Sequence, residues 1–232
     1  MLKKILIPIL ILCLLLTGCA KTPEASAPEA APVEQPAASE APAVEESAEE
    51  VSRSISPLPD TTMDNLSDCI LSVSLDKDSV YTDESGTVQM RVKIYSYDKY
   101  DMVDISMLKE GDSIISHSGE VEVSTLERKD GCILINGGLD ANGIELATDD
   151  CGVFFESGYN DAKSWHEVGE ATFPLAEGFV CYDYADMDKG EVLLNADSFI
   201  NGEIEVFYFS PHNTGIRLEN GQVVEMNRIY VP

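Results

Sequence analysis

The chain has few basic residues for its size. Its 232 residues include 15 Lys and Arg against 42 Asp and Glu, which gives a formal net charge of −27. Residues 59–232 alone carry 11 basic and 34 acidic residues, a net charge of −23. Binding of a polyanion depends on cationic side chains that neutralise phosphates, so this composition excludes nucleic acid as a partner. The same charge attracts divalent cations and cationic partners.

The sequence also lacks the signatures of common enzymes. It contains three histidines, at positions 117, 166 and 212, and no Gly-x-Ser-x-Gly elbow or phosphate-binding glycine loop. A zinc-protease helix built on His166-Glu167 would need a second histidine at position 170, which is Glu170, and Gly169 disfavours a helix there. His117 and His212 are predicted to lie in exposed turns. The pattern favours a binding module over an enzyme, with a hydrolase based on His166 as a weaker alternative.

A basic start and a short apolar run precede a cysteine near the N-terminus. Met1-Leu2-Lys3-Lys4 is followed by an apolar run of 12 residues, 5–16, which is too short to span a bilayer as a helix and fits a signal-peptide core. The next residues, Leu16-Thr17-Gly18-Cys19, resemble the lipobox of bacterial lipoproteins. An ordinary secretory signal with an incidental cysteine is the alternative.

The lipobox resemblance implies a location for the protein. Residues 1–18 would be removed as a signal peptide, and the thiol of Cys19 would carry diacylglyceryl as a thioether. Acyl chains contribute about 0.8 kcal/mol per buried CH₂, so a multiply acylated cysteine is a firm anchor. The resemblance therefore implies a cell-membrane lipoprotein whose remaining chain lies on the extracytoplasmic side.

Four cysteines remain after the signal and the lipidated cysteine are set aside: Cys69, Cys132, Cys151 and Cys181. An even number outside the cytoplasm permits two disulfides in any of three connectivities. None of the four is spaced as Cys-x-x-Cys, so neither a redox motif nor a zinc knuckle is indicated. Buried thiols and disulfides are both compatible with the sequence.

Composition divides the remainder into a tether and a domain. Residues 19–58 consist mainly of Ala, Pro, Glu and Ser, and such a segment cannot bury enough apolar surface to offset its ordering entropy. We expect a disordered tether that extends a folded domain, residues 59–232, away from the membrane.

In residues 59–232, apolar and polar residues alternate with period two, which predicts strands. Asp130-Gly131 and Asn220-Gly221 are strong hairpin signals, and Ser118-Gly119 marks a further turn. Residues 139–178 are rich in Gly, Asp and Asn and are predicted to form long loops with short strands or one helical turn. The predicted strands are 87–97, 112–117, 120–127, 132–136, 179–184, 204–209, 214–219 and 222–231.

These strands predict an all-β domain, either an antiparallel β-barrel or a sandwich of hairpins, with the short meander-like spacings favouring the barrel. Residues 204–209 are apolar on both faces and are expected in the middle of a sheet. The tail, residues 228–232, is expected to belong to a closing strand.

One face of the predicted strand 87–97 gathers cations and rings. Arg91, Lys93, Tyr95 and Tyr97 share one parity, and Lys99 joins them if the strand continues. Rings can stack on a sugar while cations bind its hydroxyl or carboxylate groups, so this cationic-aromatic strip predicts a glycan-binding surface. The alternative is cross-strand pairing of Arg91 and Lys93 with acids such as Glu120 and Glu122.

An acidic segment offers a second candidate site. Asp183, Asp186 and Asp188 lie within nine residues of one another, together with Gly190 and Glu191. Hard oxygen ligands at alternate positions suit calcium, although the spacing differs from an EF-hand loop. The sequence thus predicts a lipid-anchored binding module for cell-surface glycan or an envelope protein, with a calcium-stabilised adhesion-type domain as the alternative. An exposed acidic turn without a ligand is the other explanation of this segment.

Overall fold

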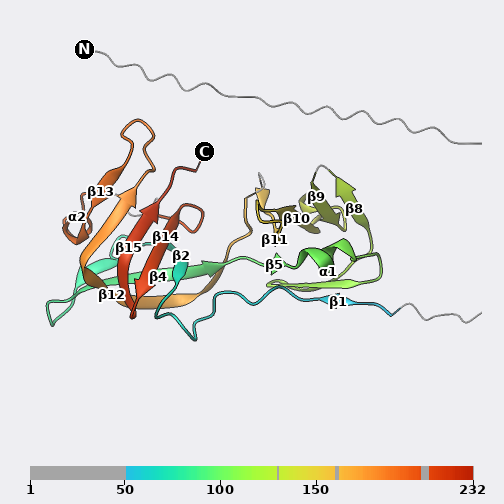
Figure 1. Cartoon of the computed structure of the whole chain (residues 1–232), viewed down its shortest axis with the longest axis horizontal. Helices are drawn as coiled ribbons and strands as arrows, with labels where there is room; N and C mark the ends of the chain where they lie inside the picture. Colours follow the sequence, from blue (N-terminus) through green and yellow to red (C-terminus); the bar gives the residue numbers. More distant parts are fainter. Residues whose placement is uncertain (1–50, 130, 160–161, 205–208, 232) are drawn as a thin grey trace, which may run out of the picture. The chain divides into compact units, whose positions relative to one another are not determined.

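The computed structural model describes residues 51–129, 131–159, 162–204 and 209–231 (Figure 1). Strands account for most of the regular structure, and the two α-helices have 5 residues each, which confirms the predicted all-β class. The signal peptide, the lipobox and residues 19–50 of the predicted tether lie outside the described residues.

The largest sheet has seven strands in the order β13-β12-β15-β14-β2-β4-β3. A further pairing of β12 with β4 joins the sheet to itself. In chain order its strands are β2 (Ile70–Ser74), β3 (Val80–Thr82), β4 (Val88–Ser96), β12 (His166–Asp183), β13 (Val192–Leu194), β14 (Thr214–Glu219) and β15 (Gln222–Arg228).

Five of these strands form a closed barrel, which confirms the barrel over the sandwich. Around the barrel they follow the order β2-β4-β12-β15-β14 and back to β2. All neighbours are antiparallel except β12 and β15, which run parallel. If β2, β4, β12, β14 and β15 are numbered 1 to 5 in chain order, their order around the barrel is 1-2-3-5-4-1. This order and its parallel pair are those of the OB fold, a Greek-key barrel.

The barrel core is apolar and continuous. The inward side chains of β4, namely Met90, Val92 and Ile94, are at most 1% exposed and alternate with outward polar ones. Helix α2 (Ala196–Ile200), between the third and fourth barrel strands, adds Phe199, whose ring lies 6.1 Å from Phe179 and 5.8 Å from Phe209. The burial of this one cluster holds the five strands together.

A large insertion separates the second and third barrel strands and, together with residues 54–55 from before the barrel, forms two further sheets. The five-stranded sheet has the order β5-β11-β10-β9-β8, and the three-stranded sheet has the order β1-β6-β7. Their own hydrophobic cluster includes Tyr100, Ile105, Ile114 and Leu146. The elements are β1 (Ser54–Ile55), β5 (Lys99–Tyr100), α1 (Met102–Ser106), β6 (Ser113–Ser116), β7 (Gly119–Glu122), β8 (Leu126–Lys129), β9 (Cys132–Ile135), a 3-10 turn (Leu139–Ala141), β10 (Ile144–Thr148) and β11 (Phe154–Glu156).

The predicted hairpins are present. β14 and β15 meet at Asn220-Gly221, whose φ angles of 51° and 74° require residues that tolerate the left-handed region. Ser118-Gly119 joins β6 to β7, and β8 pairs with β9 across the predicted Asp-Gly turn, of which Gly131 is described. Turn chemistry therefore located these hairpins correctly.

Four predictions about the strands need correction. The strand predicted over 222–231 ends at Arg228, so residues 229–231 of the predicted closing tail lie outside it. The segment 120–127 is two strands, β7 and β8, in different sheets. The domain is not wholly antiparallel, because β12 pairs with β15, and β1 with β6, in parallel. Strand β12, the longest, begins at His166 in the region predicted as loops. Its exposed glutamates, Pro174 and glycines interrupt the alternation of apolar and polar residues from which a strand is predicted.

The folded part begins earlier than residue 59. Ile55 is 3% exposed, β1 pairs with β6, and the backbone N–H of Leu58 donates to the carbonyl of Lys99. Residues 54–58 thus belong to the fold rather than to the tether. The predicted strand 204–209 includes residues 205–208, which lie outside the described residues.

The four cysteines form no disulfide, although all lie in the described part of the chain. Burial raises the pKa of the Cys181 thiol to about 12, so at neutral pH this thiol acts as a small apolar side chain in the barrel core.

We predict that deletion of residues 226–232 abolishes the cooperative thermal transition. Met226 is fully buried, and residues 226–228 pair with both β12 and β14, so their loss opens the barrel. Thermal unfolding followed by circular dichroism measures the effect. Deletion of residues 229–232, which follow the strand, is the control and should retain the transition. Equal melting temperatures for the two deletions would contradict the prediction.

Candidate functional site

The pairing of β4 with β12 places two aromatic side chains next to each other. Ser96 at the end of β4 lies opposite His166 at the start of β12, so Tyr97 and Trp165 are the adjoining residues. Their ring centroids are 4.8 Å apart at an interplanar angle of 74°, an edge-to-face arrangement. The two rings come from segments that the sequence separates by the whole insertion.

Two lysines lie over this aromatic pair. The Nζ atom of Lys163 is 4.3 Å from the ring centroid of Tyr97 and 5.9 Å from that of Trp165. Nζ of Lys99 lies 5.2 Å from the Tyr97 ring. These distances fall within the range of cation–π attraction.

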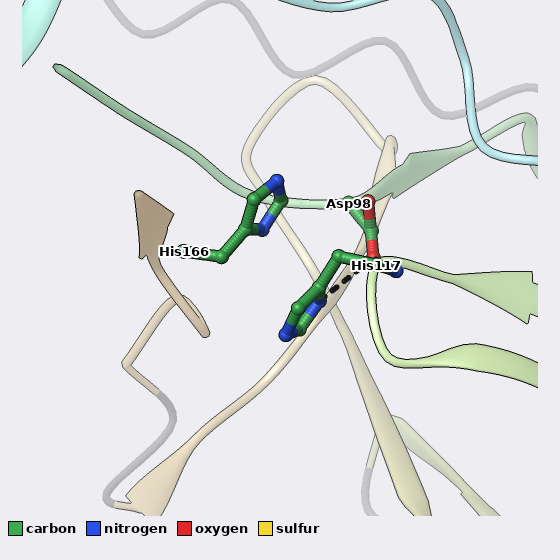
Figure 2. Close-up of side chains that lie close together, drawn as sticks. All are labelled: Asp98, His117 and His166. Atoms are coloured by element: carbon green, nitrogen blue, oxygen red, sulfur yellow. Dashed lines mark hydrogen bonds and ion pairs between the residues drawn. The ribbon is translucent and has the colours of Figure 1, made fainter. Parts of the chain in front are cut away.

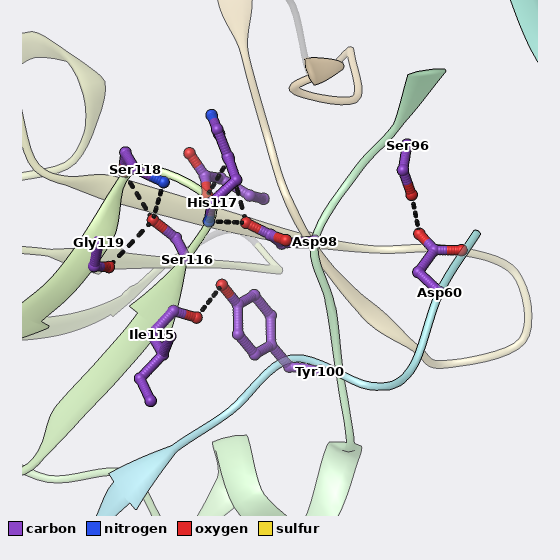
Figure 3. Close-up of polar contacts among 10 residues, drawn as sticks. Asp60, Ser96, Asp98, Tyr100, Ile115, Ser116, His117, Ser118 and Gly119 are labelled. Atoms are coloured by element: carbon purple, nitrogen blue, oxygen red, sulfur yellow. Dashed lines mark hydrogen bonds and ion pairs between the residues drawn. The ribbon is translucent and has the colours of Figure 1, made fainter. Parts of the chain in front are cut away.

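A groove of about 190 Å³ opens beside the rings, and we call it the aromatic groove. Its polar part is a small network around the carboxylate of Asp60. Ser96 Oγ donates to one oxygen of this carboxylate (Figure 3), and Lys99 Nζ donates to the other. Its lining residues are Asp60, Thr61, Ile70, Ser72, Tyr95, Ser96, Tyr97, Lys99 and Trp165.

The charge of Asp60 is stabilised within this groove. Burial acts to raise its pKa, but the hydrogen bonds from Ser96 and Lys99 outweigh burial and hold the pKa below its ordinary value. The groove therefore presents one fixed carboxylate and one fixed ammonium group next to two rings.

The predicted cationic-aromatic strip lies on one outward face, as expected. Exposed or half-exposed residues alternate with buried ones from Arg91 to Tyr100. Lys99 keeps this parity, although β4 ends at Ser96 and Lys99 belongs to another sheet. Tyr95, Tyr97 and Lys99 line the aromatic groove, whereas Arg91 and Lys93 do not.

The two basic residues of the strip pair across strands with partners that the sequence did not indicate. Arg91 Nε is 3.8 Å from Glu170, and Lys93 Nζ is 3.7 Å from Glu167, both on β12. Pairing with Glu120 and Glu122 was therefore wrong. Exposed pairs of this kind contribute about 0.2–1 kcal/mol each and leave the cations accessible to a ligand.

The acidic segment is largely committed to ion pairs. Both carboxylate oxygens of Asp183 accept hydrogen bonds from Arg228, and both side chains are 12% exposed. Asp186 pairs with Lys189 at 2.9 Å. The segment borders a groove of about 800 Å³, but two of the three predicted calcium ligands already have cationic partners.

A second cluster, which the sequence did not indicate, gathers two histidines and an aspartate. Asp98 follows β4, His117 lies in the β6–β7 turn and His166 begins β12 (Figure 2). One ligand atom from each lies within 4.8 Å of the others. We call these three residues the histidine cluster. His117 was predicted to lie in an exposed turn, and its side chain is 31% exposed.

The rings of the histidine cluster are stacked. Their centroids are 4.3 Å apart at an angle of 12°. Burial, with the nearby His117, lowers the pKa of His166. The neighbouring Glu156 of β11 has its pKa raised, chiefly by burial, despite the attraction of His117. Neutral imidazole is the form of His166 that this environment favours.

Hydrogen bonds hold the turn that carries His117. Its backbone N–H donates to Oδ2 of Asp98 at 2.6 Å, and Nδ1 lies 3.1 Å from the same oxygen. The hydroxyl of the buried Tyr100 donates to the carbonyl of Ile115, and the hydroxyls of Ser116 and Ser118 share a hydrogen bond (Figure 3). These contacts fix the backbone of the turn that carries His117.

The chain matches no protein-family model, no curated protein and no solved structure. Within the described residues, no helix combines the length and apolar character needed to cross a membrane.

We predict that Asp60→Asn destabilises the protein at neutral pH and that the difference from wild type shrinks below about pH 3.8. The pKa of Asp60 is lowered from 3.8, so its contribution is present above that pH and is lost as the folded carboxyl is protonated. Thermal unfolding across pH measures the difference. Asp64→Asn, at an exposed neighbouring carboxylate, is the control. A difference that stays constant down to pH 2 would contradict the prediction.

Proposed function

We propose that this protein is a lipid-anchored, extracytoplasmic binding protein that recognises carbohydrate on the outer face of β4 and β12. The observation that carries the proposal is the edge-to-face pair of Tyr97 and Trp165, set beside the Asp60–Lys99 ion pair in one groove. Rings provide apolar contact with the C–H face of a sugar, while the ion pair offers an acceptor and a donor for hydroxyl groups.

The barrel topology supports the choice of this face. In OB-fold barrels the face of the second and third strands binds oligonucleotides or oligosaccharides. Here those strands are β4 and β12, and their outward side carries the cationic-aromatic strip. This support is an analogy between folds, and the particular side chains must supply the recognition. The net charge of −27 disfavours binding of an oligonucleotide, so an oligosaccharide is the remaining one of these two ligand classes.

The location rests on the lipobox resemblance. A lipid on Cys19 would fix the chain to the cell membrane, and the predicted tether that follows would connect it to the barrel in the extracytoplasmic space. Surface glycans and envelope proteins are the available partners there. A calcium-stabilised adhesion-type domain is less well supported, because Asp183 and Asp186 already have cationic partners.

Carbohydrate binding can be tested on a glycan array. We expect Trp165→Ala and the double variant Tyr95→Ala/Tyr97→Ala to weaken binding at least about tenfold, a loss of about 1.4 kcal/mol. Tyr81→Ala is the matched control, because Tyr81 is an exposed tyrosine of β3 in the same sheet and does not line the groove. Unchanged binding by both groove variants would contradict the proposal.

Lipid anchoring can be tested by metabolic labelling with palmitate in a bacterial host. We expect label on the wild-type chain in the membrane fraction and none on Cys19→Ala, because the thiol is the acceptor. Cys151→Ser, at an exposed cysteine of the folded part, is the control and should be labelled like wild type. Label that persists on Cys19→Ala would exclude the lipobox assignment.

A further inference from the structure

The histidine cluster contains the donor atoms of a metal site. Asp98, His117 and His166 are distant in sequence, yet one ligand atom from each lies within 4.8 Å of the others (Figure 2). Within the described residues this is the one group of three such side chains that converges in this way. The cluster is separate from the acidic segment that the sequence suggested for calcium.

Two buried polar atoms beside the cluster lack partners. Nδ1 of His166 and Oε2 of Glu156 are inaccessible and make no hydrogen bond. An unsatisfied buried polar group is costly and rare in folded proteins, so each calls for a partner. Oε2 of Glu156 lies 3.9 Å from Nδ1 of His117, which places both orphaned atoms around the same three residues.

We propose that Asp98, His117 and His166 bind one divalent first-row transition-metal ion, with Glu156 facing the ion's remaining position. Two imidazoles and a carboxylate are ligands that zinc and its neighbours accept, whereas calcium and magnesium prefer sets made only of oxygen. Three protein ligands leave a position for water or a ligand group. This inference goes beyond carbohydrate binding and does not depend on it.

The distances suit such an ion once one imidazole rotates, because two stacked rings cannot both point a nitrogen lone pair at the same ion. Two ligands at 2.0–2.1 Å from a tetrahedral ion are separated by about 3.3 Å. Nδ1 of His117 and Oδ2 of Asp98 are already 3.1 Å apart. The widest separation in the cluster is within 4.8 Å, and rotation of the partly exposed His117 side chain can shorten it.

The three ligands would connect different parts of the fold. Asp98 and His166 adjoin the ends of two barrel strands, and His117 belongs to a turn of the insertion. A bound ion would therefore fasten the β6–β7 turn to the barrel. Asp98 and His166 also directly follow Tyr97 and Trp165, so the ion would stiffen the segments that hold the aromatic groove.

Calorimetric titration of the purified, metal-depleted full chain with Zn²⁺ tests the site. We expect one ion per chain, an affinity that falls more than about 100-fold in His117→Ala and in His166→Ala, and little competition from excess Ca²⁺. His212→Ala is the matched control, because it removes the remaining histidine and should bind like wild type. Absence of Zn²⁺ binding, or equal binding by all three variants, would overturn the proposal.

A titration with Co²⁺ tests the same site in the unmodified protein, so it does not depend on whether a variant folds. We expect visible absorption that saturates at one equivalent and is displaced by Zn²⁺, without a thiolate charge-transfer band. A thiolate band would assign the metal to cysteines and overturn the proposal, as would no saturable spectrum. Glycan binding, measured with and without Zn²⁺, separates failure of this site from failure of the proposed function.

Discussion

The pairing of β12 with two different partners closes the barrel, and the other features of the domain depend on this closure. Residues 166–174 of β12 pair with β4, and from Leu175 onward the strand pairs with β15, with a bulge between Leu175 and Val180. The bulge contains Gly178 at a φ of 86°, a conformation that favours glycine, and it turns the strand around the core. The bend lets β12 follow the curved wall of the barrel, so that the sheet can close on itself.

Closure also positions the candidate sites. The end of β4 and the start of β12 meet in register, which brings Tyr97 to Trp165 and Asp98 to His166. Successive residues point in opposite directions in an extended chain, so the aromatic groove and the histidine cluster can form side by side from the same two segments. The insertion then adds His117 to the cluster through a single turn.

The acidity of the domain and its sites are compatible because most cations are locally paired. Arg91 and Lys93 each lie close to a glutamate of β12, and Arg228 pairs with Asp183 at the end of the same strand. The buried Asp183–Arg228 pair satisfies charges that would otherwise be costly at the barrel end. The surplus of carboxylates then gives the domain a net negative charge, which repels polyanions.

The sequence by itself determined the all-β class and the hairpins at its Asn-Gly, Ser-Gly and Asp-Gly turns. It also determined the alternation of exposed and buried residues from Arg91 to Lys99. Turn chemistry and period-two burial are local properties, so the sequence alone can show them. It also carried the lipobox pattern. The tertiary structure decided the rest. The long strand β12 is stabilised by pairing with strands far along the chain. Its glutamates, Pro174 and glycines interrupt the alternation of apolar and polar residues, so the sequence does not predict this strand. Asp98, His117 and His166 meet only after barrel closure, since no spacing in the sequence reports a contact made across an insertion.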